Sequence, residues 1–532
     1  MKLKFTLLHA ALLLLILSLS TGCRTSDEEQ TASIVVALEN DVQTLDPVML
    51  SDPYTSRVVW QMYEGLVGLD EGEPAPLIAE SWEPSEDFTS WTFKIRPDVY
   101  FHKSGVFGTG DSTRTVTAED VAYSYTRFAK GIGSFIFSGL VEGIDDYVSG
   151  NAESVSGFEV VDPYTFRIHL TRRDPSLIYR ITSPYLAIMS REAVENDPDA
   201  FGQSVSVGTG PFKLEGRSDT EVRLVRNERY WRETTGNLDQ ITFRVEKNPQ
   251  FRVTQFQNES YDLLQLPVSF LPTYMSDGSL ESEADGERRI YTQTTLNIHF
   301  LGMNTEKVED VDLRRAIAHA VNKEEIVQQL LYGQGEVAAS PVNAGLQGYQ
   351  PPTGFSFSLD SAKAALDRSS YDGRPLKISV SDAPNSEQVG QVVQSRLRDV
   401  GIETELERTD FNTLTSRVFG EGKPELFVYF YEWIYSAPEI LLNIYTSDGI
   451  PAPNVFGYRN QQVDALLDQA SEQSDREAIN DLARQAEQIA QQDAPALWLF
   501  HQTNVYLMRP ELEGFEVNKH NHWELANATL SD

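Results

Sequence analysis

Residue patterns that could support catalysis are sparse in this chain of 532 residues. The sequence contains no G-x-S-x-G nucleophile elbow, no H-E-x-x-H pair and no phosphate-binding P-loop. Its single cysteine, Cys23, lies at the amino terminus, so the body of the chain offers no cysteine nucleophile. Acidic residues are so numerous that a pair of carboxylates is not diagnostic of glycosidase chemistry. The sequence therefore predicts a protein that is not an enzyme and has no cofactor.

Two short motifs contain residue types that can bind a metal or a phosphate, but we predict that neither forms such a site. His520-Asn521-His522 places two of the eight histidines close together, but no further metal ligands follow at binding distance in the sequence. We expect these histidines to be surface residues and the metal content to be none. Residues 208–212 (GTGPF) are rich in glycine, but they lack the lysine of a phosphate loop and contain a proline. They predict a tight turn that enters a strand.

The charge of the chain limits its partners. The formal net charge is −35, and acidic residues are spread along the whole sequence instead of forming blocks. Phosphate backbones require clustered Lys and Arg, so nucleic acid is excluded as a partner. The pattern predicts a solvated acidic surface, which either suits a salty environment or keeps the protein soluble.

The amino terminus has the features of a secretory signal. Lys2 and Lys4 precede an apolar run over residues 7–19, and small residues follow it up to Cys23. The run is shorter than the roughly 20 residues that a membrane-spanning helix needs. The small-small-Cys ending resembles a bacterial lipobox, in which the cysteine is acylated. We therefore expect a signal peptide over residues 1–22, lipidation at Cys23 and a membrane-anchored tether over residues 23–33, with ordinary signal cleavage as the alternative.

The remaining chain mixes strand and helix patterns and predicts an α/β protein. Residues 91–96 and 165–170 alternate apolar and polar side chains, which indicates half-buried strands. Thr117 begins a capping-box-like helix start, and Asn322 begins another, with Gly333 as its C-terminal cap. Inside residues 475–492, an apolar stripe predicts a core-facing helix; it consists of Ile479, Leu482, Ala486 and Ile489.

Several separated blocks resemble the bacterial family 5 extracellular solute-binding proteins, the dipeptide- and oligopeptide-binding group. They follow the order of the family and cover nearly the whole chain after the tether. The similar stretches are residues 77–82, 91–96, 99–102, 116–121, 208–212, 227–231, 301–305, 313–323, 464–467 and 495–497.

The resemblance implies a two-lobed periplasmic-binding-protein clamshell of type II, in the large peptide-binding class, with two chain crossings at the hinge. Lobe 1 would hold residues 34–298 and 506–532, with an extra subdomain at about 60–190. Lobe 2 would hold residues 299–505. The implied partners are a small-molecule or peptide ligand between the lobes and the permease subunits of an ABC importer. We expect a monomer on the extracytoplasmic side of a membrane.

The segment at residues 429–439 (YFYEWIYSAPE) carries the most specific ligand prediction. In the family, a similar segment lines the cleft, and an aspartate three residues after the tryptophan holds the α-ammonium group of a peptide. Here Ser436 occupies that position, and a hydroxyl cannot neutralise a buried ammonium. Either Glu432, Glu439 or Asp52 replaces the aspartate, or the solute has no free amino terminus, as in a blocked peptide, an opine, an oligosaccharide or a metal chelate.

Alternation within this segment predicts two faces. Rings at Tyr429, Tyr431, Trp433 and Tyr435 share one face, and because each carries a polar group we expect them to form a wet cleft wall. On the opposite face we expect Phe430 to be core.

Residues outside the segment complete the predicted site. The resemblance adds Phe411 and Arg417, with Arg417 either pairing with a ligand carboxylate or lying on the surface. Ser51, Asp52 and Tyr54 would reach the cleft from lobe 1, next to Asp46, which we expect to be a structural turn residue. The rival functions are an envelope sensor or chaperone on the same scaffold and a surface hydrolase.

Overall fold

The computed structural model describes residues 31–50, 52–70, 72–109, 112–131, 134–280, 288–420 and 422–531, with the side chains of 134 and 135 left out. The predicted signal peptide, Cys23 and most of the tether lie outside these residues. In the described part, strands and helices alternate along the chain, as the sequence predicts for an α/β protein.

One 11-stranded sheet runs through the molecule. Its order is β17-β16-β18-β14-β19-β11-β1-β10-β9-β8, and β15 also pairs with β19. The strands are β1 (Ser33–Leu38), β8 (Phe212–Arg217), β9 (Glu221–Arg226), β10 (Gln240–Val245), β11 (Leu263–Gln265), β14 (Arg289–Met303), β15 (Gly335–Val337), β16 (Leu376–Ser381), β17 (Thr404–Thr409), β18 (Leu426–Tyr431) and β19 (Ala496–Met508).

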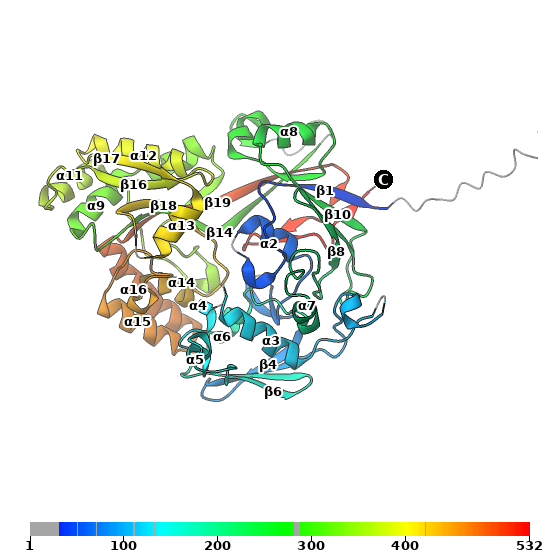
Figure 1. The fold of residues 1–532 in the computed structure, drawn as a ribbon. Coiled ribbons are helices and arrows are strands. Elements are labelled where there is room, and N and C mark those ends of the chain that lie inside the picture. Colours follow the sequence, from blue (N-terminus) through cyan, green and yellow to red (C-terminus); the bar gives the residue numbers. More distant parts are fainter. Residues whose placement is uncertain are drawn as a thin grey trace, which may run out of the picture.

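Two long antiparallel strands, β14 and β19, connect the two sides of this sheet (Figure 1). The final half of β14 pairs with β18, from Ile298 to Met303, whereas the end of β19 pairs with β11, from Tyr506 to Met508. Between these regions the β14–β19 register shifts, between Thr294 and Ile298. The two halves of the molecule are thus joined where the ladder is interrupted, which is the arrangement of a two-lobed clamshell with paired chain crossings.

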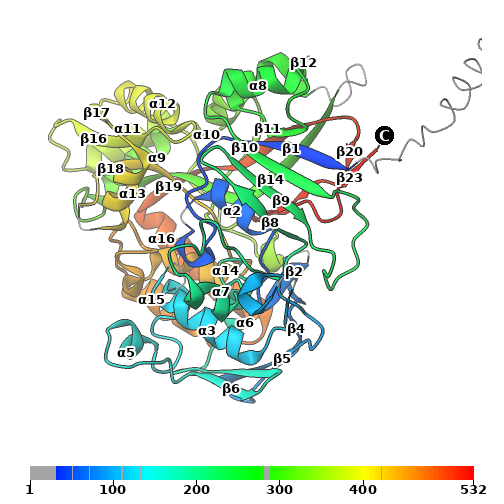
Figure 2. The same cartoon turned by 45° about the vertical axis from the view of Figure 1, so that its right-hand side comes forward.

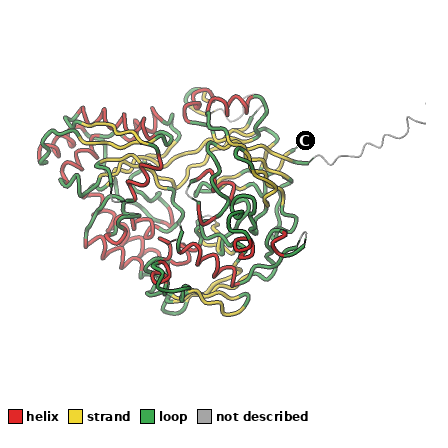
Figure 3. The backbone as a smooth tube through the Cα atoms, viewed as in Figure 1, coloured by secondary structure: helices red, strands yellow, loops and turns green. Residues whose placement is uncertain are grey.

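Helices cover the strands mainly on the side that contains β16 to β18 (Figure 3). Helices of that side pack on an apolar core that includes Leu301, Ile317 and Val393. The helices on this core are α9 (Val311–Ala320), α11 (Leu359–Arg368) and α12 (Ser386–Asp399), with the short α10 (Lys323–Glu325) following α9. The buried residues of α13 (Phe411–Phe419), α14 (Pro438–Leu441), α15 (Gln461–Ser471) and α16 (Arg476–Asp493) belong to the larger core, which includes Leu414, Ile440 and Ala486.

A separate four-stranded sheet, in the order β4-β5-β7-β6, lies away from the main sheet (Figure 2). Its strands are β4 (Ala79–Pro84), β5 (Ser90–Ile95), β6 (Phe158–Asp162) and β7 (Thr165–His169), and α3 (Ala118–Ala129) packs against it. Smaller elements complete this part and the adjoining chain: β2 (Val67–Asp70), β3 (Glu73–Pro76), α2 (Pro53–Val59), α4 (Ser134–Phe137), α5 (Ile144–Val148), α6 (Leu177–Ile181), α7 (Arg191–Asn196) and α8 (Pro249–Gln257).

Short hairpins occupy the remaining chain. They are β12 (Met275–Ser276) with β13 (Ser279–Leu280), β20 (Leu512–Glu513) with β23 (Thr529–Leu530), and β21 (Glu516–Val517) with β22 (Trp523–Glu524). The last two form the C-terminal tail, which carries His520 and Asn521 back toward the crossing strands.

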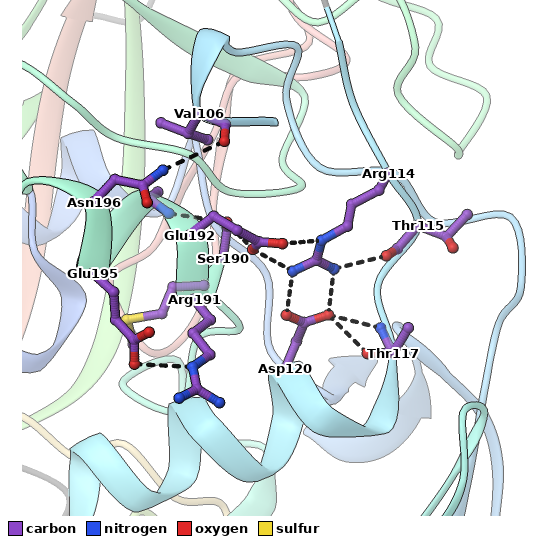
Figure 4. A network of polar contacts seen from close by, with 12 residues as sticks. Val106, Arg114, Thr115, Thr117, Asp120, Ser190, Arg191, Glu192, Glu195 and Asn196 are labelled. Atoms are coloured by element: carbon purple, nitrogen blue, oxygen red, sulfur yellow. Dashed lines mark hydrogen bonds and ion pairs between the residues drawn. The ribbon is translucent and has the colours of Figure 1, made fainter. Parts of the chain in front are cut away.

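Hydrogen bonds and ion pairs hold the start of α3 in position. Asp120, at the third position of the helix, accepts a hydrogen bond from the Thr117 N–H at 2.9 Å, as the sequence predicts for a capping box. Figure 4 shows the Arg114 guanidinium between the carboxylates of Asp120 and Glu192. Two parallel bonds of 2.7 Å join Arg114 to Asp120, so the arginine ties α3 to α7.

The other local predictions are confirmed with small shifts. Strands form at β5 and β7, and β8 begins at Phe212 after the glycine turn. Gly208 and Gly210 are required there because a Cβ on either would lie within 3 Å of the Met62 carbonyl oxygen. Asn322 caps α10, which continues as a π-helical turn (Ile326–Leu330), and Gly333 follows in the left-handed conformation. In α16, the fully buried stripe is Ile479, Ala483, Ala486 and Ala490, whereas Leu482 and Ile489 lie at its edge.

Candidate functional site

The predicted binding segment lies at the end of β18 and in the chain that follows. Tyr431 pairs with Ile298 of β14, which places residues 432–436 directly beside the interruption of the crossing strands. Burial alternates through residue 435, as predicted. However, the buried face consists of Tyr429, Tyr431, Trp433 and Tyr435, and the half-buried face consists of Phe430, Glu432 and Ile434. The expected assignment of the two faces is therefore reversed.

The buried rings satisfy their polar groups inside the protein. The Tyr431 hydroxyl donates to the Pro453 carbonyl at 2.8 Å, and Trp433 Nε1 donates to the Pro341 carbonyl at 2.8 Å. Tyr429 shares a 2.9 Å hydrogen bond with Thr415, and Tyr435 is buried near Arg180. These rings belong to the hydrophobic core, which differs from the wet aromatic wall that we expected. Contact of Tyr431, Trp433 and Tyr435 with a ligand stays a prediction.

Phe430 was expected to be core and is instead half-buried. Its ring stacks on His299 at a centroid distance of 5.3 Å and on Phe411 at 5.6 Å. Phe411, the first residue of α13, also stacks on Tyr429. Arg417, later in α13, pairs with Glu407 at 2.9 Å, so its guanidinium already has a carboxylate partner within its own lobe. Ligand contacts by Phe411 and Arg417 stay a prediction.

Glu432 meets residues from three other parts of the chain. Its Oε1 accepts from Asn297 Nδ2 at 3.1 Å, in the interrupted stretch of β14, and from Asn521 Nδ2 at 3.5 Å, in the C-terminal tail. Burial raises the pKa of the Glu432 carboxyl, while the charge of Arg57 opposes that rise and Asp52 adds to it. Asp52 and Glu432, two of the predicted site residues, therefore lie close enough for their like charges to interact.

Arg57 is the cation of this region, and it is only 2% exposed. Its Nη1 pairs with Glu39 at 2.9 Å, and its Nη2 donates to the side chain of Gln265. The guanidinium also lies 4.5 Å from the Trp523 ring and 5.4 Å from the Tyr54 ring. Burial, helped by the charge of Glu39, raises the pKa of Tyr54 to about 12. Tyr54, in the first turn of α2, therefore carries a neutral hydroxyl.

The predicted lobe 1 residues lie at the amino-terminal end of α2. Asp52 caps this helix by accepting from the Thr55 N–H at 2.8 Å, and Ser51 lies outside the described residues. Asp46 caps the preceding short helix (Pro47–Met49) and pairs with Arg127 at 2.9 Å, which is the structural turn role expected of it.

Ser436 faces the C-terminal tail. Its hydroxyl lies 2.9 Å from Nε2 of His520, and Nδ1 of His520 lies 2.6 Å from the Trp433 carbonyl. His520 is 8% exposed, so the expectation that residues 520–522 decorate the surface was wrong. Groups of three or more metal-ligating side chains are absent from the described residues.

Glu439 is committed to other partners. It accepts a hydrogen bond from Ser176 of the amino-terminal half and pairs with Arg476 at 2.8 Å. Of the three carboxylates expected to replace the family aspartate, Glu439 is therefore neutralised and Asp52 is a helix cap, whereas Glu432 is bound only by amides.

A cavity of about 840 Å³ lies beside this region. Among the predicted site residues it is lined by Ser436 alone, together with residues of both halves that include Trp60, Glu64, Leu346, His520 and His522. The Trp60 and His522 rings, with centroids 3.6 Å apart and planes tilted by 34°, form part of its wall. Glu64 is fully engaged by Thr209, Tyr230 and Trp231, at 2.8, 2.8 and 3.0 Å, and its pKa is raised by burial.

Sequence reasoning missed several residues of the site. Arg57, Asn297, Asn521 and His520 all approach the predicted segment, yet they are separated from it by up to hundreds of positions. Of these residues, only Arg57 could have been found from the sequence. It lies three residues after Tyr54 and so on a neighbouring turn of the same helix.

Two halves joined by interrupted crossing strands, with polar residues of both halves meeting beside the crossing, define a two-lobed solute-binding protein. No helix in the described part of the chain has the length and apolar character to cross a membrane. The profile of the bacterial extracellular solute-binding proteins, family 5, matches residues 73–451, and the chain belongs to this family.

Individual proteins extend the comparison. The chain is 25% identical to heme-binding protein A of Haemophilus influenzae, covering 86% of this chain and 84% of that protein. It is 24% identical to the dipeptide-binding protein DppE of Bacillus subtilis, covering 90% and 88%. The crystal structure of a Pseudoalteromonas dipeptide-binding protein in complex with Met-Leu aligns with a TM-score of 0.78 at 22% identity, over 94% of this chain and 100% of that chain. This last likeness concerns the fold alone.

Proposed function

We propose that this protein captures a peptide or a similar small polar solute between its two lobes and delivers it unchanged to the permease of an ABC importer. Family membership and relatives named for dipeptide binding support this function. The observation that carries it is the meeting of Glu432, Asn297 and Asn521 beside the interrupted crossing strands, next to Asp52 and Arg57. Polar groups from both lobes there give a solute a reason to favour the closed arrangement.

The proposed lobes keep the predicted limits, with residues 34–298 and 506–532 in lobe 1, an extra subdomain at about 60–190, and residues 299–505 in lobe 2. The register shift after Thr294 and the pairing of β11 with the end of β19 support these limits. A side-chain hydrogen bond between Ser176 and Glu439 also bridges the two proposed lobes.

The experiment is a thermal-shift panel on the mature protein, followed by mass spectrometry of the recovered solute. A bound solute at 100 times its dissociation constant stabilises the folded state by about 2.7 kcal/mol. Stabilisation by peptides that are recovered intact supports the function. Recovery of cleaved peptides indicates a hydrolase, and stabilisation only by a non-peptide such as heme, the ligand in the name of one relative, reassigns the solute.

Anchoring at Cys23 is the second part of the proposal. The sequence places this cysteine at the end of the signal-like region, and acylation there would hold the monomer at the outer side of a membrane. Labelling with a radioactive fatty acid should mark the wild-type chain and leave Cys23→Ser unlabelled. A labelled Cys23→Ser chain, or an unlabelled wild-type chain, contradicts the anchor without affecting solute binding.

A further inference from the structure

The cavity beside the binding segment is walled almost entirely by proposed lobe 1. Of the described residues that line it, only Leu346 and Ser436 come from proposed lobe 2. Its volume of about 840 Å³ lies within the range of roughly 300–1,000 Å³ that small-molecule sites occupy. A chamber formed by one lobe needs a cover from the other lobe to enclose a solute. Ser436 is bound to His520 of the chamber wall, and the other contribution is the turn that carries Leu346.

This turn, residues 345–348, is anchored in its own lobe. Asn480 Nδ2 donates to the main-chain carbonyl of Gln347 at 2.9 Å. Tyr349, the next residue after the turn, is fully buried and donates through its hydroxyl to Glu487 at 2.6 Å. Both partners belong to α16, so the base of the turn moves with lobe 2.

The side chain of Gln347 reaches across to lobe 1 with both of its polar atoms. Its Nε2 donates to the Gly72 carbonyl at 3.0 Å, and its Oε1 lies 3.0 Å from the Tyr179 hydroxyl. Burial raises the pKa of Tyr179 to about 12, so this hydroxyl keeps its proton and can donate it. Gly72 itself lines the cavity, and Tyr179 lies in α6. One amide group therefore joins the turn to two elements of lobe 1.

The closed position of the turn also carries costs. Gln347 has φ +51° and ψ +31°, a left-handed conformation that residues with a side chain rarely adopt. Oδ1 of Asn343, before the turn, and Oδ1 of Asn480 are buried without a partner among the described residues. Glu73 Oε2, also 3.0 Å from the Tyr179 hydroxyl, competes for its proton. These costs oppose the cross-lobe bonds, as expected of an element that has two positions.

Resting on the proposed function, we propose that residues 345–348 are a lid over the chamber of lobe 1 and that Gln347 is its latch. Leu346 is apolar and 9% exposed, which gives the lid an inner face suited to an apolar group of the solute. Gln347 does not line the cavity and acts as a positioning residue. Because the latch bonds exist only when the lid is closed, they slow the escape of the solute and leave its entry unchanged.

The rival explanation is a static contact between the lobes that never opens. A static contact contributes to unfolding of the whole protein, whereas a latch controls local opening and solute release. The variant that separates them is Gln347→Glu, which keeps the size of the side chain but turns a carboxylate oxygen toward the Gly72 carbonyl. Gln469→Glu, at an exposed position of α15, makes the same charge change away from the turn and is the control.

The first measurement is hydrogen–deuterium exchange of the solute-free mature protein over residues 343–349. The amides of Leu346, Gly348 and Tyr349 are hydrogen-bonded within this stretch. In Gln347→Glu their exchange should be at least about fivefold faster than in wild type, the factor that corresponds to one net hydrogen bond. Gln469→Glu should exchange like wild type. Equal exchange in all three proteins overturns the lid.

The second measurement is release of a bound solute. Native mass spectrometry selects the peptide that wild type retains best from a pool of synthetic di- to pentapeptides, and stopped-flow tryptophan fluorescence gives its rates. Dissociation should be about fivefold faster in Gln347→Glu, with the association rate unchanged. Gln347→Gly removes the latch and relieves the left-handed strain, so it should release the peptide equally fast without a lower melting temperature.

The outcomes separate the lid from the proposed function. Wild-type dissociation rates in both Gln347 variants overturn the latch and leave peptide capture intact. Faster release that is accompanied by a matching loss of thermal stability in Gln347→Gly also overturns it, because that result describes a static contact. A wild-type protein that retains no peptide contradicts peptide capture, and the exchange measurement then decides the lid by itself.

Discussion

The hydroxyl of Ser436 lies 2.9 Å from Nε2 of His520, although 84 positions separate the two residues in the chain. The other ring nitrogen of His520, Nδ1, lies 2.6 Å from the Trp433 carbonyl, which can only accept. Nδ1 must therefore carry the proton, and Nε2 accepts from Ser436. The bond fastens the binding segment to the C-terminal tail through a neutral imidazole, and burial lowers the pKa of His520 in agreement with that state.

Ser436→Ala should destabilise the protein by about 1–3 kcal/mol, because it leaves the buried His520 Nε2 without a donor. Urea unfolding at pH 7 measures the effect. Ser204→Ala, at an exposed position, should stay within about 0.5 kcal/mol of the wild type. In a double-mutant cycle with His520→Gln, a coupling energy near zero would show that the two side chains do not interact in solution.

Because His102 is buried and neutral, we predict that the folded protein loses stability in mild acid. Nδ1 of its ring accepts from the Gly208 N–H at 3.3 Å, and Nε2 donates to the Gly210 carbonyl at 3.0 Å, so protonation would break the first bond. Burial lowers the pKa of His102 from 6.5 to about 4. In this interval the unfolded chain binds more protons than the folded one, so stability falls as pH decreases from 6.5 toward 4.

The measurement compares wild type with His102→Gln, which keeps a donor and an acceptor but cannot titrate near neutrality. Between pH 7.5 and 4.5 the wild type should lose about 2.5 kcal/mol more than the variant, at about 1.4 kcal/mol per unit of pKa shift. Parallel pH profiles of the two proteins would contradict the prediction. Because other buried histidines are present in both proteins, their contributions cancel in the comparison.

Local pattern predicted the elements of this fold better than it predicted the site. Helix α3 and strand β5 follow from residues within one element, since a capping carboxylate and an alternating run each act over a few positions. In the segment from Tyr429 to Tyr435, alternation gives the period of burial but not which side is the core. Aromatic residues occupy both faces, and only the packing of Trp433 and Tyr431 against distant carbonyl groups decides the matter.

The histidines of the tail were misjudged for a related reason. His520 is polar and close to the chain end, which is typical of an exposed residue. Its burial depends on Ser436 and Trp433, and no periodicity links these positions. Glu432 could be predicted as a candidate counter-charge, whereas its amide partner Asn297 could not, because that contact depends on the interrupted pairing of the crossing strands.

For Glu487 we predict a contribution to folding stability whose pH dependence is opposite to that of His102. This carboxyl is fully buried in α16 and accepts from the Tyr349 hydroxyl at 2.6 Å and from Gln491 at 2.9 Å. Burial raises its pKa from 4.5 to about 7. Between these values the unfolded chain binds fewer protons than the folded one, so this group lowers stability as pH rises from 4.5 to 7.

Glu487→Gln should remove that dependence. Relative to the wild type, the variant should gain roughly 2–3 kcal/mol of stability between pH 5 and pH 8, since each unit of pKa shift corresponds to about 1.4 kcal/mol. Guanidinium unfolding at the two pH values gives the comparison. Glu477→Gln, in the exposed first turn of the same helix, is the matched control, and an equal change in both variants would mean that Glu487 titrates normally.

Ser176 and Arg476 should affect closure and folding differently, although both bind Glu439. Glu439 is 3% exposed and pairs with Arg476 within the same proposed lobe, whereas Ser176 donates to it from the other. Arg476→Ala leaves a buried carboxylate without a counter-charge and should cost about 3–5 kcal/mol in unfolding free energy. Ser176→Ala removes only one cross-lobe hydrogen bond, worth about 1 kcal/mol, and leaves the ion pair in place.

Because that bond exists only when the lobes meet, its loss should reduce the closed population and weaken solute affinity by about fivefold, with little change in unfolding. Small-angle X-ray scattering of the solute-free protein should show a larger radius of gyration for Ser176→Ala than for wild type. Saturating solute should bring both to the same value, since binding selects the closed state. Identical radii and affinities for the two proteins would mean that the Ser176–Glu439 contact does not contribute to closure.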